Sequence, residues 1–422
     1  MERIVLDNGL RLLLLPETES RIFTLDVWVD AGSRFETGYH SGISHLAEHM
    51  VFKGTETRSS LDISLAMDDI GGLINAYTGQ EHTRYYVKTL GEYATQALEL
   101  LTDMLLHAAI PARELELERQ VVLEEIAMYE DSPEDMAHDN LAELVWQGHP
   151  LGTPISGTRE SVSAIDREEL LGFLRNRYTP DRMLLVCAGD FDRETVLRTV
   201  EQAFSIRPVS TETEPLTPPM FQTGIVRRQK ENEQVCLELG FPGLSSTAPQ
   251  RYTLTLLTAL LGDGESSRLY QRLREELGLV YGVYAVHYGS KDAGLYTISV
   301  STSAENQLVV LKEIGGVLTT LLTDGVPAEE LNRVKKKVKT AFVMSLETVA
   351  ARAAREGRSE HLSARSVSVE EVLAAWERVT EEDILCLAWQ IFGGAAALSA
   401  VGPVEEESAY RAVLQTFPGG ND

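Results

Sequence analysis

The stretch TRYYVKTL, residues 83–90, alternates in the manner of a β-strand, and the chain that follows it decides the fold because the same succession occurs twice. Two helical patterns come next, EYATQALELLTDMLLHA and IPARELELERQVVLEEIAMYE. In the second half of the chain, the strand pattern GLYTISVS, residues 294–301, is followed by NQLVVLKEIGGVLTTLLTDG and VPAEELNRVKKKVKTAFVMSLE. This order predicts two homologous α+β units, each an antiparallel β-sheet packed with helices.

Two further features recur at matching places in the two halves. Pro111 and Pro327 each open the second of the two helical patterns, where proline is favoured at a first helical position. The strand patterns MLLVCAGD (183–190) and ALSAVGP (397–403) each stop at a glycine near the end of their half. A gene duplication is the simplest explanation of this repetition.

A proline-rich segment, PVSTETEPLTPP at residues 208–219, divides the chain almost in half. It holds four prolines and no cluster of large apolar side chains, which is typical of a linker. We therefore predict one unit over residues 1–207 and a second unit over residues 220–422.

Composition and charge restrict the class of protein. Of the 422 residues, 43% are hydrophobic and 24% are charged, as in ordinary globular proteins, and the formal net charge is −26. Phosphate groups repel so acidic a chain, so we expect neither nucleic-acid binding nor docking on an anionic membrane. No apolar run approaches the roughly 18 residues that a membrane span needs.

The start of the chain and its cysteines bear on cellular location. The opening MERIVLDNGLRLLLL is typical of two short strands joined by a turn, and it lacks the basic and apolar regions of a signal peptide. Cys187, Cys236 and Cys386 lie in apolar stretches, and we expect buried thiols at all three positions. These observations predict a cytoplasmic protein of a bacterium.

The stretch HLAEHMVFKGT, residues 45–55, places two histidines four residues apart on a predicted helix. His45 and His49 then lie on the same face, where two neutral imidazoles can bind one metal ion. Glu48 precedes the second histidine and projects from a neighbouring strip of that surface. The order H-x-x-E-H is the reverse of the commoner metal-binding order H-E-x-x-H.

A catalytic zinc ion typically takes three protein ligands, so a third ligand must come from elsewhere in the fold. The helix predicted at 113–130 supplies the best candidates, Glu118 and Glu125, which are seven residues apart and share a face. Taken separately, the two patterns also fit a structural histidine pair and a solvent-exposed helix. Their presence together in one half of the chain favours a metal site.

The second half lacks the corresponding residues. Aligning the Ser-x-Leu of 44–46 with that of 267–269 places RLYQR, residues 268–272, opposite HLAEH. Counting an equal distance from each matched proline places Ala341 opposite Glu125. We therefore expect a metal-bearing first unit and a metal-free second unit.

Taken together, the motifs resemble the M16 metallopeptidase family, the inverzincins, which include mitochondrial processing peptidase, pitrilysin and insulin-degrading enzyme. The resemblance rests on HLAEHMVFKGT, GGLINAYTGQEHTRYYVKTL (71–90), ERQVVLEEI (118–126) and SSRLYQRLREELGLVYGVYA (266–285). It runs from the first strand to the end of the second unit. The length of the chain is similar to that of the half-size, bacterial processing-peptidase-like members.

The resemblance also implies roles for individual residues. In the family the distal ligand is a glutamate far along the chain, and Glu125 lies 76 residues after His49. The resemblance implies that His45, His49 and Glu125 bind zinc, that Glu48 is the general base, and that Glu118 tunes the ligands. It also implies that substrate binds along an edge strand at Asn75 and Ala76. Arg274 and Tyr281 would contact the substrate and the transition state.

An activity follows from the same resemblance: a zinc-dependent endopeptidase, with one Zn²⁺ per chain, that cleaves short or unfolded peptides. The resemblance also implies a homodimer, or a heterodimer with a metal-free homologue, in which Arg274 and Tyr281 act across the partner. The alternative is a non-catalytic scaffold subunit of a peptidase complex. Family members of that kind usually lack part of the H-x-x-E-H set, which is complete here.

Overall fold

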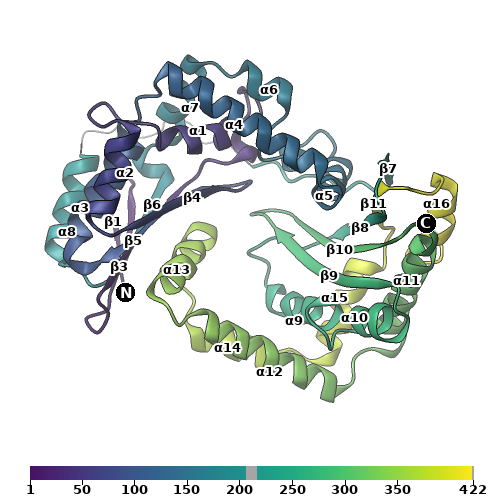
Figure 1. Cartoon of the computed structure of the whole chain (residues 1–422). Coiled ribbons are helices and arrows are strands. Elements are labelled where there is room, and N and C mark those ends of the chain that lie inside the picture. The colour runs from purple at the N-terminus through teal and green to yellow at the C-terminus, as the bar shows by residue number, and fades with distance from the viewer. Residues whose placement is uncertain (206–215, 421–422) are drawn as a thin grey trace. The chain divides into compact units, whose positions relative to one another are not determined.

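The computed structural model describes residues 1–205 and 216–420 (Figure 1). Most of the predicted linker, 208–219, lies outside these residues. The chain forms two compact units, each built around one β-sheet. So far as they are described, the first unit consists of Met1–Ala127, Thr153–Pro215 and Ser345–Ser366, and the second of Met128–Gly152, Leu216–Met344 and Val367–Asp422.

The sheet of the first unit has six strands: β1 (Glu2–Val5), β2 (Arg11–Pro16), β3 (Ile22–Val29), β4 (Leu73–Thr78), β5 (Thr83–Leu90) and β6 (Met183–Gly189). Their order in the sheet is β1-β2-β6-β3-β5-β4, so β4 is an edge strand. Neighbours are antiparallel except β2 and β6, which run parallel. A long helical connection precedes β6, as a parallel pairing requires.

The sheet of the second unit has five strands: β7 (Ile225–Gln229), β8 (Gln234–Pro242), β9 (Val280–Gly289), β10 (Gly294–Ser303) and β11 (Ala397–Gly402). Their order, β7-β11-β8-β10-β9, matches β2-β6-β3-β5-β4 of the first sheet. Here too one pair, β7 and β11, is parallel. The α+β class and the repeated unit are therefore confirmed, and each predicted antiparallel sheet proves to contain one parallel pair.

Helices cover both faces of the first sheet (Figure 1). The helices of this unit are α1 (Ile43–Val51), α2 (Ser60–Asp69), α3 (Ala94–Leu106), α4 (Ala112–Asp131), α6 (Arg159–Ala164), α7 (Arg167–Arg177), α8 (Arg193–Phe204) and α13 (Val349–Ser363). The main core lies on the face where α1 and α3 pack, and includes Leu46, Met50 and Leu101. Helix α13 covers part of the opposite face, where Ala353 meets Trp28.

Helices also lie on both faces of the second sheet. The helices of this unit are α5 (Pro133–Val145), α9 (Arg251–Gly262), α10 (Arg268–Tyr270), α11 (Gln307–Asp324), α12 (Ala328–Ser345), α14 (Val369–Arg378), α15 (Glu381–Phe392) and α16 (Glu407–Leu414). Helices α9, α11 and α15 pack on one face, over a core that includes Leu257, Ile314 and Leu387. Helix α5 covers part of the other face, where Leu141 and Val145 pack against Ala397.

The compact units divide the chain differently from the predicted halves, 1–207 and 220–422. Helix α5 belongs to the first half of the sequence but packs on β8 and β11 of the second unit. Helix α13 belongs to the second half but packs on β3 and β6 of the first unit. Each helix buries its apolar side on the sheet of the other repeat, and periodicity along the sequence carries no information about such an exchange.

The prediction for the cysteines is correct at two positions and wrong at the third. Cys187 and Cys236 are buried, but Cys386 is exposed. The buried stripe of α15 runs through Ile384, Leu387 and Ile391, and Cys386 lies outside it. Neighbours in a helix point in different directions, so an apolar sequence context does not ensure burial. Among the described helices, none combines the length and the apolar character needed to cross a bilayer.

Candidate metal centre

Helix α1 carries both histidines of the H-x-x-E-H motif, and a buried carboxylate holds its first turn. The helix begins after Gly42, which has a φ of +89°, a conformation that favours glycine. Glycine has no side chain that could cap the helix. Glu36 supplies the cap instead, since its two carboxylate oxygens accept hydrogen bonds of 2.9 Å from the N–H groups of Gly42 and Ser44. Burial raises the pKa of Glu36 to about 7.

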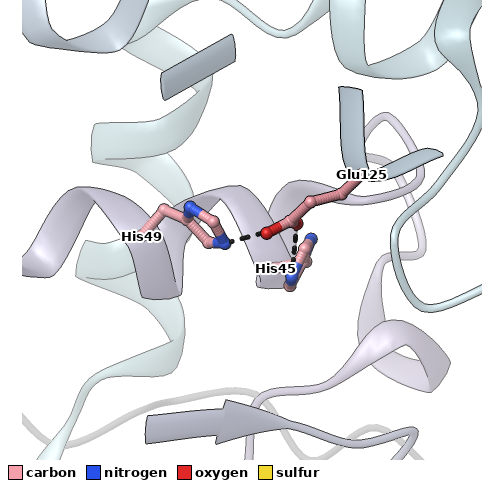
Figure 2. A group of neighbouring side chains, drawn as sticks. All are labelled: His45, His49 and Glu125. Atoms are coloured by element: carbon pink, nitrogen blue, oxygen red, sulfur yellow. Dashed lines mark ion pairs between the residues drawn. The ribbon is translucent and has the colours of Figure 1, made fainter. Parts of the chain in front are cut away.

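Glu125 comes from α4 and reaches both histidines (Figure 2). Its Oε2 lies 3.7 Å from Nε2 of His45 and 3.7 Å from Nε2 of His49. One ligand atom from each of the three residues lies within 4.8 Å of the others. Ligands on a tetrahedral zinc ion are roughly 3.4 Å apart, given bonds of about 2.0–2.1 Å. The two distances to Glu125 are therefore within a few tenths of an ångström of those in a zinc site, and all three donor atoms lie close enough to converge on one ion.

Protonation at the site also suits a metal ion. Burial, and secondarily the neighbouring His49, lowers the pKa of His45 to about 4, so its imidazole is neutral at pH 7. A neutral imidazole is the form that ligates a metal. Two neutral nitrogen donors and one carboxylate are a donor set that zinc accepts readily.

Glu118 contacts the other ring nitrogen of His49. Its Oε2 lies 3.1 Å from Nδ1 of His49, and its Oε1 lies 2.7 Å from the ammonium nitrogen of Lys53. When Nδ1 carries the proton and donates it to Glu118, Nε2 presents its lone pair on the side of Glu125. Glu118 therefore lies against the ring nitrogen of His49 that faces away from Glu125.

Glu48 lies on the same helix, half-buried, and faces the edge strand of the sheet. Its Oε2 accepts a hydrogen bond of 2.5 Å from the hydroxyl of Thr78, at the end of β4. Burial raises the pKa of Glu48, while the hydrogen bond from Thr78 lowers it in part. A carboxylate with a raised pKa is a better proton acceptor than an exposed one.

Strand β4, which contains Asn75 and Ala76, lies at the edge of the sheet, and among the described strands only β5 pairs with it. The Gly79 N–H bonds to the carbonyl of His82 in the turn that joins the two strands. Hydrogen-bonded pairs alternate in an antiparallel ladder, so the main-chain groups of Ala76 point away from β5. In agreement, the N–H of Ala76 donates to the side chain of Asn75, at 2.8 Å, and not to β5.

Arg274 and Tyr281 lie together in the second unit. Tyr281 stands near the start of β9 with 80% of its surface exposed. The guanidinium of Arg274, in the helical turn Gln271–Glu276, stacks 4.4 Å from the centre of the Tyr281 ring and donates to the Tyr281 carbonyl. The structure therefore brings these two predicted residues into direct contact with each other.

Three residues of the site were not found by sequence reasoning. Lys53 lies within the quoted motif, but nothing in a single helix shows that it meets Glu118. Thr78 and Glu36 contact α1 through the tertiary fold alone. For Glu36, the one local signal was Gly42, a helix start with no capping side chain of its own.

Comparisons with known proteins identify the family of the chain. A family model described as insulinase (peptidase family M16) matches residues 12–159, and one described as the peptidase M16 inactive domain matches residues 164–338. A Bacillus subtilis protein named as the uncharacterized zinc protease YmxG is 38% identical over 404 residues, which cover 96% of this chain and 98% of the relative. A Streptomyces coelicolor protein, also named as an uncharacterized zinc protease, is 33% identical and covers 97% of this chain and 91% of its own.

Two crystal structures show the same fold. One is titled as a peptidase M16 inactive domain from Pseudomonas fluorescens, with a TM-score of 0.90 at 19% identity, covering 96% of this chain and 98% of the other. The second is a protease from Helicobacter pylori, with a TM-score of 0.87 at 22% identity, covering 95% and 99%. The family resemblance of the sequence is therefore confirmed: the chain belongs to the M16 peptidase family.

Proposed function

We propose that this chain is a zinc-dependent endopeptidase that hydrolyses short or unfolded polypeptides. One observation carries the proposal: Nε2 of His45 and Nε2 of His49 both lie 3.7 Å from the same oxygen of Glu125. The proposal is supported by two relatives that are named as zinc proteases. His45, His49 and Glu125 would hold one Zn²⁺ per chain, which supplies a Lewis acid for the reaction when bound.

Glu48 is the proposed general base. It takes a proton from the attacking water and later delivers that proton to the leaving amine. Its position one residue before His49 keeps it next to the ligands, and the hydroxyl of Thr78 fixes one of its oxygens. Its pKa, which burial raises above the ordinary value, makes it a stronger proton acceptor than an exposed carboxylate.

The free edge of β4 is the proposed binding place for substrate. A peptide that adds to this edge as an extended strand bonds to the outward main-chain groups, including those of Ala76, and displaces the side chain of Asn75 from the Ala76 N–H. Main-chain bonding of this kind requires an unfolded segment and tolerates many sequences. Thr78 links this edge to Glu48, so a bound strand passes beside the base.

Arg274 and Tyr281 are proposed to contact the substrate and, through the tyrosine hydroxyl, the oxyanion of the transition state. The exposure of Tyr281 and the stacking of Arg274 on its ring support a contact role for the pair. We propose that they act on the site of a partner chain, in a homodimer or in a heterodimer with a metal-free homologue.

A single variant tests the proposed activity against a scaffold role. Glu48→Gln should bind zinc as the parent does and cleave an unstructured peptide about 10²- to 10⁴-fold more slowly. The control is Glu124→Gln, an exposed glutamate beside Glu125 that should leave the rate unchanged. A parent protein that binds zinc but shows no cleavage that a chelator abolishes would point to the scaffold instead.

A further inference from the structure

Lys53, Glu118 and His49 form a chain of contacts that leads to the metal site. Lys53 and His49 are four residues apart, and both meet Glu118 of α4. Each oxygen of Glu118 has one partner: Oε1 lies 2.7 Å from Lys53 and Oε2 lies 3.1 Å from His49. Glu118 is buried, and the side chain of Lys53 is 27% exposed.

A second carboxylate next to the site raises a question of charge. A divalent ion with two neutral imidazoles and the carboxylate of Glu125 is positive overall, which favours stabilisation of an oxyanion. The carboxylate of Glu118 would cancel that charge, and the ammonium group of Lys53 restores it. Lys53 also occupies Oε1, so Glu118 can turn only Oε2 toward His49.

We propose that Lys53 is a positioning residue that acts on the metal site through Glu118. It holds Glu118 in the one orientation in which Nδ1 of His49 stays protonated and Nε2 faces Glu125. The part of the inference that concerns zinc rests on the proposed function, whereas the tautomer of His49 does not.

Two effects of Lys53 on zinc affinity have opposite signs, which makes the inference testable. Its positive charge repels a cation, so charge alone predicts tighter zinc binding when Lys53 is removed. Its hold on Glu118 orients His49, so positioning predicts weaker binding. Mutating the hydrogen-bond partner of a ligating histidine typically changes metal affinity or activity by about 10- to 100-fold. We therefore expect the positioning effect to be larger than the charge effect. A contact that only ties α1 to α4 would change thermal stability and leave the tautomer as it was.

The experiment compares Lys53→Met with Lys53→Arg in the full-length protein. Zinc affinity is measured by chelator competition, and the His49 tautomer by ¹⁵N NMR of the metal-free protein. Lys53→Met should weaken zinc binding about tenfold and lower the share of Nδ1-protonated His49, and Lys53→Arg should preserve both. In a Glu118→Gln background, Lys53→Met should have no further effect. The matched control is Lys339→Met, which breaks a 2.7 Å ion pair with Glu377 in the second unit and should change neither quantity.

Three results would overturn the inference: zinc binding by Lys53→Met as tight as or tighter than in the parent, an unchanged tautomer in that variant, or an equal effect of Lys53→Met with and without Glu118. A fourth contradicting result can come from the parent protein alone, so it does not depend on the folding of Lys53→Met. If the proton of His49 in the metal-free parent resides on Nε2, the inference is wrong. Failure of the parent to cleave peptides, with the expected tautomer and zinc affinities intact, would reject the proposed function and leave the role of Lys53 standing.

Discussion

The hydroxyl of Thr78 donates a 2.5 Å hydrogen bond to Oε2 of Glu48. This bond joins the last residue of the edge strand β4 to the carboxylate that we propose as the general base. The bond thereby fixes the position of the water-activating group relative to the strand on which a substrate would lie. The bond therefore bears on both binding and catalysis.

Thr78→Val should raise the pKa of Glu48, because the hydrogen bond from Thr78 lowers it. The base acts only when ionised, so the acidic limb of the pH profile of kcat/KM should move to higher pH. On that limb the rate should fall at a given pH, and Thr78→Ser, which keeps the donor, should restore it. An unshifted limb in the valine variant would exclude this role of the bond.

Loss of any one proposed ligand should weaken zinc binding by orders of magnitude. His45→Ala, His49→Ala and Glu125→Gln each remove one of the three donor atoms that lie within 4.8 Å of one another. Zinc content after dialysis is the measurement, and thermal unfolding of the metal-free proteins controls for folding. Full zinc occupancy in Glu125→Gln would mean that the third ligand is a different residue.

Ala76→Pro should impair substrate binding while leaving the fold intact. Proline removes an N–H that points away from β5, which an edge strand tolerates. Losing one main-chain bond to substrate should cost about 1 kcal/mol, or several-fold in kcat/KM, with little change in Tm. In contrast, Tyr77→Pro removes an N–H that should bond to β5, and should lower Tm strongly. Equal activity of the parent and Ala76→Pro would place the substrate elsewhere.

Glu36→Gln should change how stability depends on pH. Burial raises the pKa of Glu36 from 4.5 to about 7, so the folded state binds the proton more tightly than the unfolded state does. The stability that this provides is fully present below pH 4.5 and is lost as the pH rises through about 7. Between pH 4.5 and 8 the parent should lose up to about 3 kcal/mol relative to Glu36→Gln. Urea unfolding at both pH values measures the difference, and Glu92→Gln, at an exposed site, should show none.

Mixing two inactive variants tests action across a dimer. A Glu48→Gln chain retains Tyr281, and a Tyr281→Phe chain retains Glu48, so a mixed dimer has one complete site if Tyr281 serves its partner. Peptide cleavage by the co-refolded mixture should then exceed the sum of the two variants alone. No gain on mixing, in a preparation shown to contain mixed dimers, would mean that the tyrosine serves its own chain or none.

Several strands were predictable because their signals are local. The patterns at 83–90, 183–190, 294–301 and 397–403 coincide closely with β5, β6, β10 and β11. Which strands become neighbours was not predictable, because pairing depends on contacts between distant segments. The parallel pairs and the exchange of α5 and α13 belong to this second kind.

The sequence by itself determined that His45 and His49 share a face, because a helical turn of 3.6 residues brings positions four apart together. It also determined that the unit is repeated and that the second copy lacks the histidines. Only the tertiary structure decided that Glu125 meets both rings and that Glu118, itself paired with Lys53, contacts Nδ1 of His49. It alone also decided that Glu36 caps α1 and that Thr78 bonds to Glu48. The physical reason is that the approach of α1 to α4 and β4 is set by the shape of the shared apolar core, to which residues from the whole unit contribute.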